Sequence, residues 1–288
     1  MNPQGPGLYD QDSYYDSDGQ ASRLAPSLNA LLYVLDKQKA KSTVRAYRRR
    51  SGQSASNPKR VLDIGAGDGK FLYFMRQLGF ETEGTTASAI SQKAAFDKFG
   101  VKLEHTTSIP PRIRDLKFDI ITYWHVFEHL DEPAAHVSCW KDMLAPGGLI
   151  VIEVPNVESL GARLAFDAWL GSDVTHHLNL MPRSEIEALL EGHGLQVVGS
   201  DDYSLKFTYP FLWSALLGRV FGTKTYDFDR IFGTLKNPLG GLREAPLTTL
   251  NAIASVAYLA PAIGAYTIAG VLTHRGEVLR LYIQPVSR

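Results

Sequence analysis

A glycine-rich loop is the part of this sequence whose residue types are best suited to binding a ligand. An apolar run, Val61–Ile64, carries Asp63, and glycines follow at alternate positions, Gly65, Gly67 and Gly69. Glycine lets the backbone turn tightly and approach a bulky ligand without a Cβ in the way. A helix that begins after the loop would present free N–H groups to that ligand, and Asp63 could order the loop or reach a cationic amino group. The Gly-x-Gly-x-Gly spacing differs from the Gly-x-Gly-x-x-Gly of dinucleotide-binding sites and disfavours that class.

An alternation of strands and helices surrounds the loop and predicts its scaffold. Apolar runs predict seven strands, at Arg60–Ile64, Glu81–Thr86, Val101–His105, Phe118–Trp124, Leu149–Val154, Leu195–Gly199 and Val278–Ile283. Apolar residues at helical spacing predict helices at 26–50, Gly69–Leu78, Ser88–Phe99, Pro133–Leu144, Val157–Leu170 and Ser184–Glu191. Strands that alternate with helices of this length indicate an α/β fold, with a parallel sheet covered by helices on both faces.

The chain is expected to divide into four segments. Residues 1–25 begin with a Gly-, Asp-, Ser- and Tyr-rich stretch without apolar periodicity, so they predict a flexible arm. Residues 26–202 hold the alternating core, residues 203–275 interrupt the alternation, and residues 276–288 supply the final core strand.

The segment 203–275 is expected to be an apolar helical insertion. Its run Ala245–Thr273 contains no charged residue, but Pro261 divides it. A membrane-spanning helix needs about 20 consecutive apolar residues, so two short helices fit better than one span. Two interpretations stay open: a lid or homodimer surface that buries apolar side chains, or a segment that lies on a membrane or encloses a lipid-linked acceptor.

Composition restricts the partners and the compartment. Lys plus Arg and Asp plus Glu are both 30 in 288 residues, so the net charge is zero and gives no argument for a nucleic-acid partner. The one cysteine, Cys139, excludes an intramolecular disulfide and a Cys-rich zinc site. The first residues lack the basic-then-apolar order of a signal peptide, so a cytoplasmic location is expected.

Three segments together resemble the class I S-adenosylmethionine-dependent methyltransferases. They are Val61–Leu72, Phe118–Asp131 and Leu144–Asn156, which include Glu128-His129-Leu130 after the fourth strand and Pro146-Gly147-Gly148 before the fifth. The later Thr175-His176-His177-Leu178 is similar to the segment after the core in a large bacterial group of that family. The resemblance implies a Rossmann-like, seven-stranded sheet whose final strand, near Leu281, is antiparallel, and S-adenosyl-L-methionine as cofactor.

The resemblance also implies roles for individual residues around the cofactor. Asp63 and the three loop glycines would surround its methionine end, Thr86 would face the ribose, and Trp124 and His125 would close the pocket. Ser108 and Ile109 would cover the adenine. Thr86 departs from the family, which carries an acid at this position. A hydroxyl lacks the charge-assisted pair of hydrogen bonds that a carboxylate makes.

Histidines are the candidates for the base that an alcohol acceptor would need. His177 matches a histidine of the family in a substrate-facing loop, and we expect it to be the general base, with a structural loop histidine as the equal alternative. Glu128 and His129 could form an oriented base, but a role in capping the helix and fixing the loop is favoured. His176 and His177 lack Cys or acidic neighbours at metal-ligand spacing, so no metal site is predicted.

The expected function is O-methylation of a glycan, lipid-linked or isoprenoid-type acceptor at the inner membrane surface. A methyltransferase for a soluble small molecule and a non-catalytic cofactor-binding protein are the alternatives. The basic residues between Lys37 and Arg50 are most simply a solvated face, with contact to anionic lipid phosphate as the second interpretation.

Overall fold

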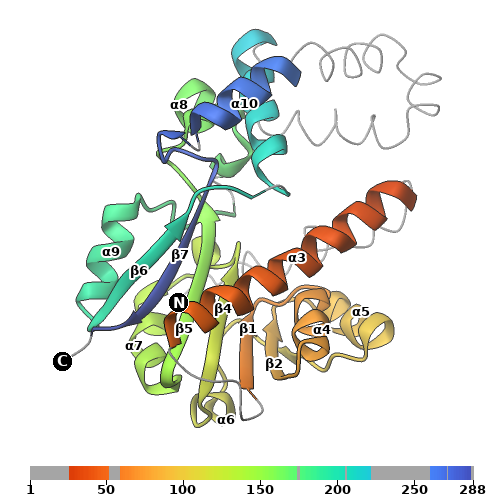
Figure 1. Ribbon diagram of the computed structural model, residues 1–288, viewed down its shortest axis with the longest axis vertical. Helices are drawn as coiled ribbons and strands as arrows, with labels where there is room; N and C mark the ends of the chain where they lie inside the picture. The colour runs from red at the N-terminus through yellow and green to blue at the C-terminus, as the bar shows by residue number, and fades with distance from the viewer. Residues whose placement is uncertain are drawn as a thin grey trace, which may run out of the picture. The chain divides into compact units, whose positions relative to one another are not determined.

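The computed structural model in Figure 1 describes residues 26–51, 59–173, 176–204, 206–221, 260–270 and 272–286. The chain divides into two compact units. The first comprises Met1–Glu153, Ile186–Ser200 and Leu281–Arg288, and the second comprises Val154–Glu185 and Asp201–Arg280. Val154–Glu185 therefore groups with the segment expected to be an insertion, because the two pack into common apolar clusters.

The sheet has seven strands in the order β3-β2-β1-β4-β5-β7-β6. They are β1 (Lys59–Ile64), β2 (Phe80–Thr86), β3 (Glu104–His105), β4 (Phe118–Trp124), β5 (Leu144–Pro155), β6 (Leu195–Asp201) and β7 (Val278–Pro285). β1 pairs in parallel with β2 and β4, β2 with β3, and β4 with β5. In Figure 1 β7 runs opposite to its neighbour β5, so the sheet is mixed but mostly parallel, which confirms the expected Rossmann-like class.

Most helices of the first unit match the predicted ones. They are α3 (Pro26–Ser51), α4 (Lys70–Gln77), α5 (Ala89–Phe99), the short α6 (Pro111–Arg114), the 3-10 turn η2 (Phe127–His129), α7 (Pro133–Met143) and α9 (Arg183–Glu191). Helix α5 begins where the Ser88 side chain accepts a hydrogen bond from the Ser91 N–H, 3.2 Å, and ends at Gly100 with φ 61°. These are the ordinary start and stop of a helix, since Ser satisfies an unpaired N–H and glycine adopts left-handed backbone at little cost.

The apolar core of the first unit packs α3 and α4 against the sheet. It includes Ala40, Val44 and Tyr47 of α3, Leu72 and Met75 of α4, and Val61, Ile120, Leu149 and Val151 of the strands. Tyr47 adds a polar tie, because its hydroxyl donates to Asp119 Oδ1 at 2.8 Å. The packing fixes one face of α3 against the strands.

The second unit is a set of short helices. They are α8 (Leu160–Ala165), the 3-10 turns η3 (Phe166–Ala168) and η4 (Leu170–Ser172), and α10 (Thr208–Phe221). Residues 260–270 are also helical, and Ile263 packs against Leu212, Trp213, Leu216 and Leu217 of α10. This helical stretch belongs to the second half of the expected pair and includes Pro261.

Two expectations fall on residues outside the described ranges. The first is the flexible arm, residues 1–25. The second is the first half of the apolar run, which lies within residues 222–259. Among the described residues no helix is long and apolar enough to cross a membrane.

A buried carboxylate organises the second unit. Glu277 is 1% exposed and accepts hydrogen bonds from Trp169 Nε1 at 2.7 Å, the Gly161 N–H at 2.9 Å and Ser159 Oγ at 3.2 Å. Burial raises the pKa of Glu277 to about 7, although the three donors act to lower it. A Cβ at Gly161 would lie 2.3 Å from Glu277 Oε2, so a side chain there would have to displace the carboxylate.

This raised pKa predicts a pH-dependent stability. The folded state holds the Glu277 proton more tightly than the unfolded chain, so its contribution is full below the unfolded pKa and is lost as pH rises through about 7. We expect the unfolding temperature of the wild-type protein to fall across that window more than the temperature of Glu277→Gln, which cannot ionise. Parallel pH profiles of the two proteins would contradict the assignment, because other titrating groups are common to both.

Candidate functional site

The glycine loop lies between the end of β1 and the start of α4. Gly65, Gly67 and Gly69 all have left-handed backbone, with φ of 68°, 52° and 72°. A Cβ at Gly65 would lie 2.4 Å from Val126 Cγ2, and one at Gly69 would lie 2.9 Å from the Ala95 Cβ. The loop therefore combines a conformation that other residues rarely adopt with a close approach that they would block.

Asp63 stands at the end of β1 with its carboxylate buried. It is 2% exposed, and Thr122 Oγ1 of the neighbouring β4 donates to its Oδ1 at 2.6 Å. Burial raises the pKa of Asp63 to about 7, while the Thr122 hydrogen bond and the charge of Lys39 lower it. A group at this position can accept hydrogen bonds and balance a positive charge beside the loop.

Lys39 brings a cation from α3 to the same strand ends. Its Nζ lies 4.5 Å from the ring centroid of Trp124 and 5.4 Å from that of Phe71, distances of cation–π contact. From the sequence, Lys39 is one of the basic residues between Lys37 and Arg50, for which a solvated face or contact with lipid phosphate was expected. The spacing of Lys39 indicates that it lies on the buried face of the helix. It precedes the buried Thr43 and Ala46 by four and seven residues and so shares their face.

His125 follows β4 and is enclosed by two carboxylates. Its Nδ1 lies 3.3 Å from Glu128 Oε1 and its Nε2 lies 3.3 Å from Glu153 Oε1, and both acidic side chains are 1% exposed. The His125 backbone is left-handed, φ 53°, and its N–H donates to the Glu153 carbonyl at 2.8 Å. Burial acts to lower the pKa of His125, but the two carboxylates outweigh it and raise the pKa above its usual value.

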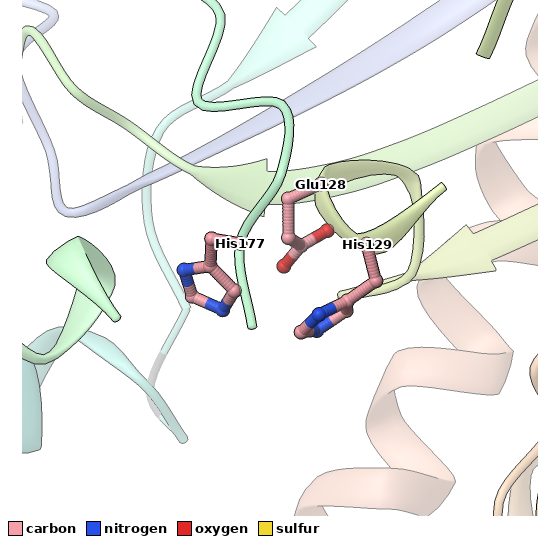
Figure 2. A group of neighbouring side chains, drawn as sticks. All are labelled: Glu128, His129 and His177. Atoms are coloured by element: carbon pink, nitrogen blue, oxygen red, sulfur yellow. The ribbon is translucent and has the colours of Figure 1, made fainter. Parts of the chain in front are cut away.

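Glu128 thus has a partner that the sequence analysis did not assign to it. Glu128 and His129 could form an oriented base, although a role in capping the helix and fixing the loop was favoured. Figure 2 shows both side chains leaving η2 at adjacent positions. The turn of the chain at His125 brings its ring to the Glu128 carboxylate three residues later. The contact between Glu128 and His125 joins η2 to the end of β4.

Thr86 lies at the end of β2 and is 2% exposed. Its Oγ1 accepts a hydrogen bond from the Ser88 N–H at 3.3 Å, so the hydroxyl also shapes the turn into α5. Glu83, the nearest acid earlier on β2, forms an ion pair with Arg112 at 3.1 Å. Glu83 is therefore engaged elsewhere and does not replace the missing acid at Thr86.

The loop after β3 borders a cavity of about 210 Å³. Ser108 and Ile109 line it together with Arg114 and His136. Ile109 is 2% exposed, and the Arg114 Nε donates to its carbonyl at 3.0 Å. Burial and the charge of Arg114 lower the pKa of His136 to about 4, so this imidazole is neutral at physiological pH.

His176 and His177 belong to the second unit, in the segment after η4, and Figure 2 shows the His177 side chain. His176 Nδ1 lies 2.8 Å from Asp173 Oδ2, so this histidine has an acidic neighbour that the sequence analysis overlooked. His177 Nδ1 lies 2.9 Å from the Gly171 carbonyl oxygen. A carbonyl only accepts hydrogen bonds, so the His177 proton sits on Nδ1 and Nε2 is the basic nitrogen.

The raised pKa of His125 gives a direct spectroscopic prediction. In NMR titrations of protein with nitrogen-labelled histidine, His125 should lose its proton above the usual pKa of a histidine, and Glu128→Gln should move that titration to lower pH. Glu132→Gln, which changes an exposed acid nearby on the chain, is the control and should leave the His125 titration unchanged. A His125 that titrates identically in both variants would contradict the enclosed ion pair.

Comparison with known proteins places these features in a family. A family model described as "Methyltransferase domain" matches residues 36–200. The ubiquinone biosynthesis O-methyltransferase of Dinoroseobacter shibae is 28% identical over 151 residues, which are 48% of this chain and 60% of that protein. This chain therefore matches less than two thirds of that relative's length.

Two solved structures share the fold. A structure named for a sarcosine dimethylglycine methyltransferase from Galdieria sulphuraria has a TM-score of 0.51 and 13% identity, covering 87% of this chain and 84% of that one. The plantazolicin methyltransferase BpumL, solved in complex with SAH, has a TM-score of 0.50 and 14% identity, covering 99% and 92%. The match of the family model to more than half of the chain is the decisive observation. The chain belongs to the methyltransferase domain family, and its α/β core is the S-adenosylmethionine-dependent methyltransferase domain of that family.

Proposed function

We propose that this protein transfers the methyl group of S-adenosylmethionine to a hydroxyl oxygen of a small acceptor. The observation that carries the proposal is the left-handed glycine loop beside the buried Asp63, within a domain of the methyltransferase family. The name of the curated relatives, O-methyltransferase, supports oxygen as the methylated atom.

The residues at the strand ends fit the cofactor. The left-handed loop of Gly65, Gly67 and Gly69 and the buried Asp63 suit the methionine end, where the carboxylate would balance the ammonium or the sulfonium charge. Thr86 would contact the ribose. Ser108 and Ile109 would contact the adenine, in a cavity where the His136 side chain is neutral. Trp124 and His125 would bound the site at the end of β4. When bound, the cofactor supplies an electrophilic methyl group.

His177 is our proposal for the general base. Its Nδ1 is directed at the Gly171 carbonyl, 2.9 Å away, which fixes the ring. As the base, its Nε2 would take the hydroxyl proton while the acceptor oxygen forms its bond to the methyl carbon and the bond from that carbon to the cofactor sulfur breaks. His129 is the second candidate for this role. Glu128 is assigned to fixing the His125 loop rather than to proton transfer.

The acceptor is proposed to be an isoprenoid-type or other lipid-linked hydroxyl compound, met at the cytoplasmic face of a membrane. The relatives' name refers to ubiquinone biosynthesis, and the second unit exposes Ile268 and Leu272 on its apolar helix. A glycan acceptor, a soluble acceptor, a homodimer and a non-catalytic binding role have no described feature that favours them over this proposal.

Cofactor binding depends on the loop glycines. Gly67→Val should abolish the calorimetric signal for S-adenosylmethionine, because the branched side chain would need left-handed backbone and would occupy the ligand's space. Gly264→Val is the control, since a Cβ there meets open space. If the folded wild-type protein shows no binding at millimolar S-adenosylmethionine, the result would contradict the proposal.

The role of His177 is tested by turnover. With a prenylated dihydroxybenzene as acceptor, His177→Ala should lower kcat by about 10²–10⁴-fold while cofactor affinity stays unchanged. His176→Ala removes the neighbouring histidine, whose Nδ1 faces Asp173, and should have a much smaller effect. Equal losses of turnover and cofactor affinity in His177→Ala would mark it as a structural residue, and full activity would move the role to His129.

A further inference from the structure

Helix α3 carries a stripe of basic residues on one face. Lys37, Lys41, Arg45 and Arg48 are all exposed and are spaced by four, four and three residues. At 100° per residue they fall within about 80° of the helix circumference and extend over about 16 Å of its length. We call these four residues the basic stripe.

The direction of the basic stripe is fixed by the packing of α3. Ala40, Ala46 and Tyr47, which lie outside the sector of the basic stripe, are 0%, 7% and 3% exposed and belong to the core of the first unit. The helix cannot rotate to hide the basic stripe without pulling these side chains out of the core. The four cations are therefore presented together, on a rigid element.

The basic stripe has no matching acids on its own helix. The one acid of α3, Asp36, is 6% exposed and lies 3.5 Å from Lys70. Within the described part of the chain, none of the four cations forms an ion pair with a carboxylate, whereas two other basic residues of α3 are packed on aromatic rings, Lys39 on Trp124 and Arg50 on Tyr282. Among the residues that the structure describes, the charge of the basic stripe is thus uncompensated.

The same face continues into an apolar residue. Val34, one turn before Lys37, is 47% exposed and lies in the same sector of the helix. Basic residues that continue into an exposed apolar side chain suit the boundary between lipid headgroups and acyl chains. A nucleic acid would match the cations but would gain nothing from Val34.

We propose that the basic stripe of α3 binds an anionic membrane surface. Lipid phosphates would lie along the four cations, and Val34 would lie at the headgroup boundary. Each basic residue near such a surface adds to the attraction, and salt weakens it. Binding through α3 does not depend on methyl transfer, so it can hold or fail separately from the proposed activity.

The test uses the full chain and sedimentation with vesicles. Phosphatidylcholine vesicles that contain phosphatidylglycerol should bind the wild-type protein at low salt, and pure phosphatidylcholine vesicles should bind it weakly. Lys41→Glu/Arg45→Glu should lower the partition coefficient at least tenfold, an effect on the order expected for reversing two charges at the surface. Lys98→Glu/Lys102→Glu makes the same change of net charge at exposed lysines elsewhere in the first unit and should change binding little.

Three outcomes would overturn the proposal. They are equal binding to neutral vesicles, equal losses in the two double variants, and displacement of the protein from vesicles by duplex DNA at a lower phosphate concentration than the lipid presents. Circular dichroism checks that the variants are folded. Gly67→Val, which is expected to lose cofactor, should still bind the vesicles, so a failure of methyl transfer and a failure of membrane binding give different results.

Discussion

The hydrogen bond from Thr122 to the buried carboxylate of Asp63 joins β1 to β4 at the point where both strands end. The glycine loop leaves β1 directly after this bond, and Gly65 packs against Val126, which follows β4. Any side chain at Gly65 would displace Val126 and, with it, the adjoining His125 between its two carboxylates. The glycine loop after β1 and the cluster of His125 with its two carboxylates after β4 therefore depend on the same packing.

Buried carboxylates recur in both units, and each has nearby groups that compensate for its burial. Asp63 receives a hydroxyl and the field of Lys39, Glu128 and Glu153 share the His125 ring, and Glu277 receives three donors. Burying a charge is costly unless it is paired and hydrogen-bonded. Specific partners, more than the apolar core, therefore determine the local geometry of the strand ends.

Much of the scaffold was predictable, because long apolar runs and glycine spacing are local signals. Strands β1 and β4, the helix α3 and the loop glycines were placed correctly, whereas β3 is shorter than expected and α6 was missed. The left-handed backbone of His125 was not predictable, since nothing in a histidine indicates it, and the contact to Glu128 depends on it. Lys39 was missed because its aromatic partners lie more than thirty residues away in the sequence.

The hydrogen bonds of Glu277 have a consequence for the order of folding. They reach Ser159, Gly161 and Trp169 across separations of 118, 116 and 108 residues. The ribosome must therefore synthesise more than a hundred further residues before the start of α8 and the indole of Trp169 meet their acceptor. Contacts of such long range form late, because the intervening chain must be ordered first. Until then the donors on Ser159, Gly161 and Trp169 lack this acceptor.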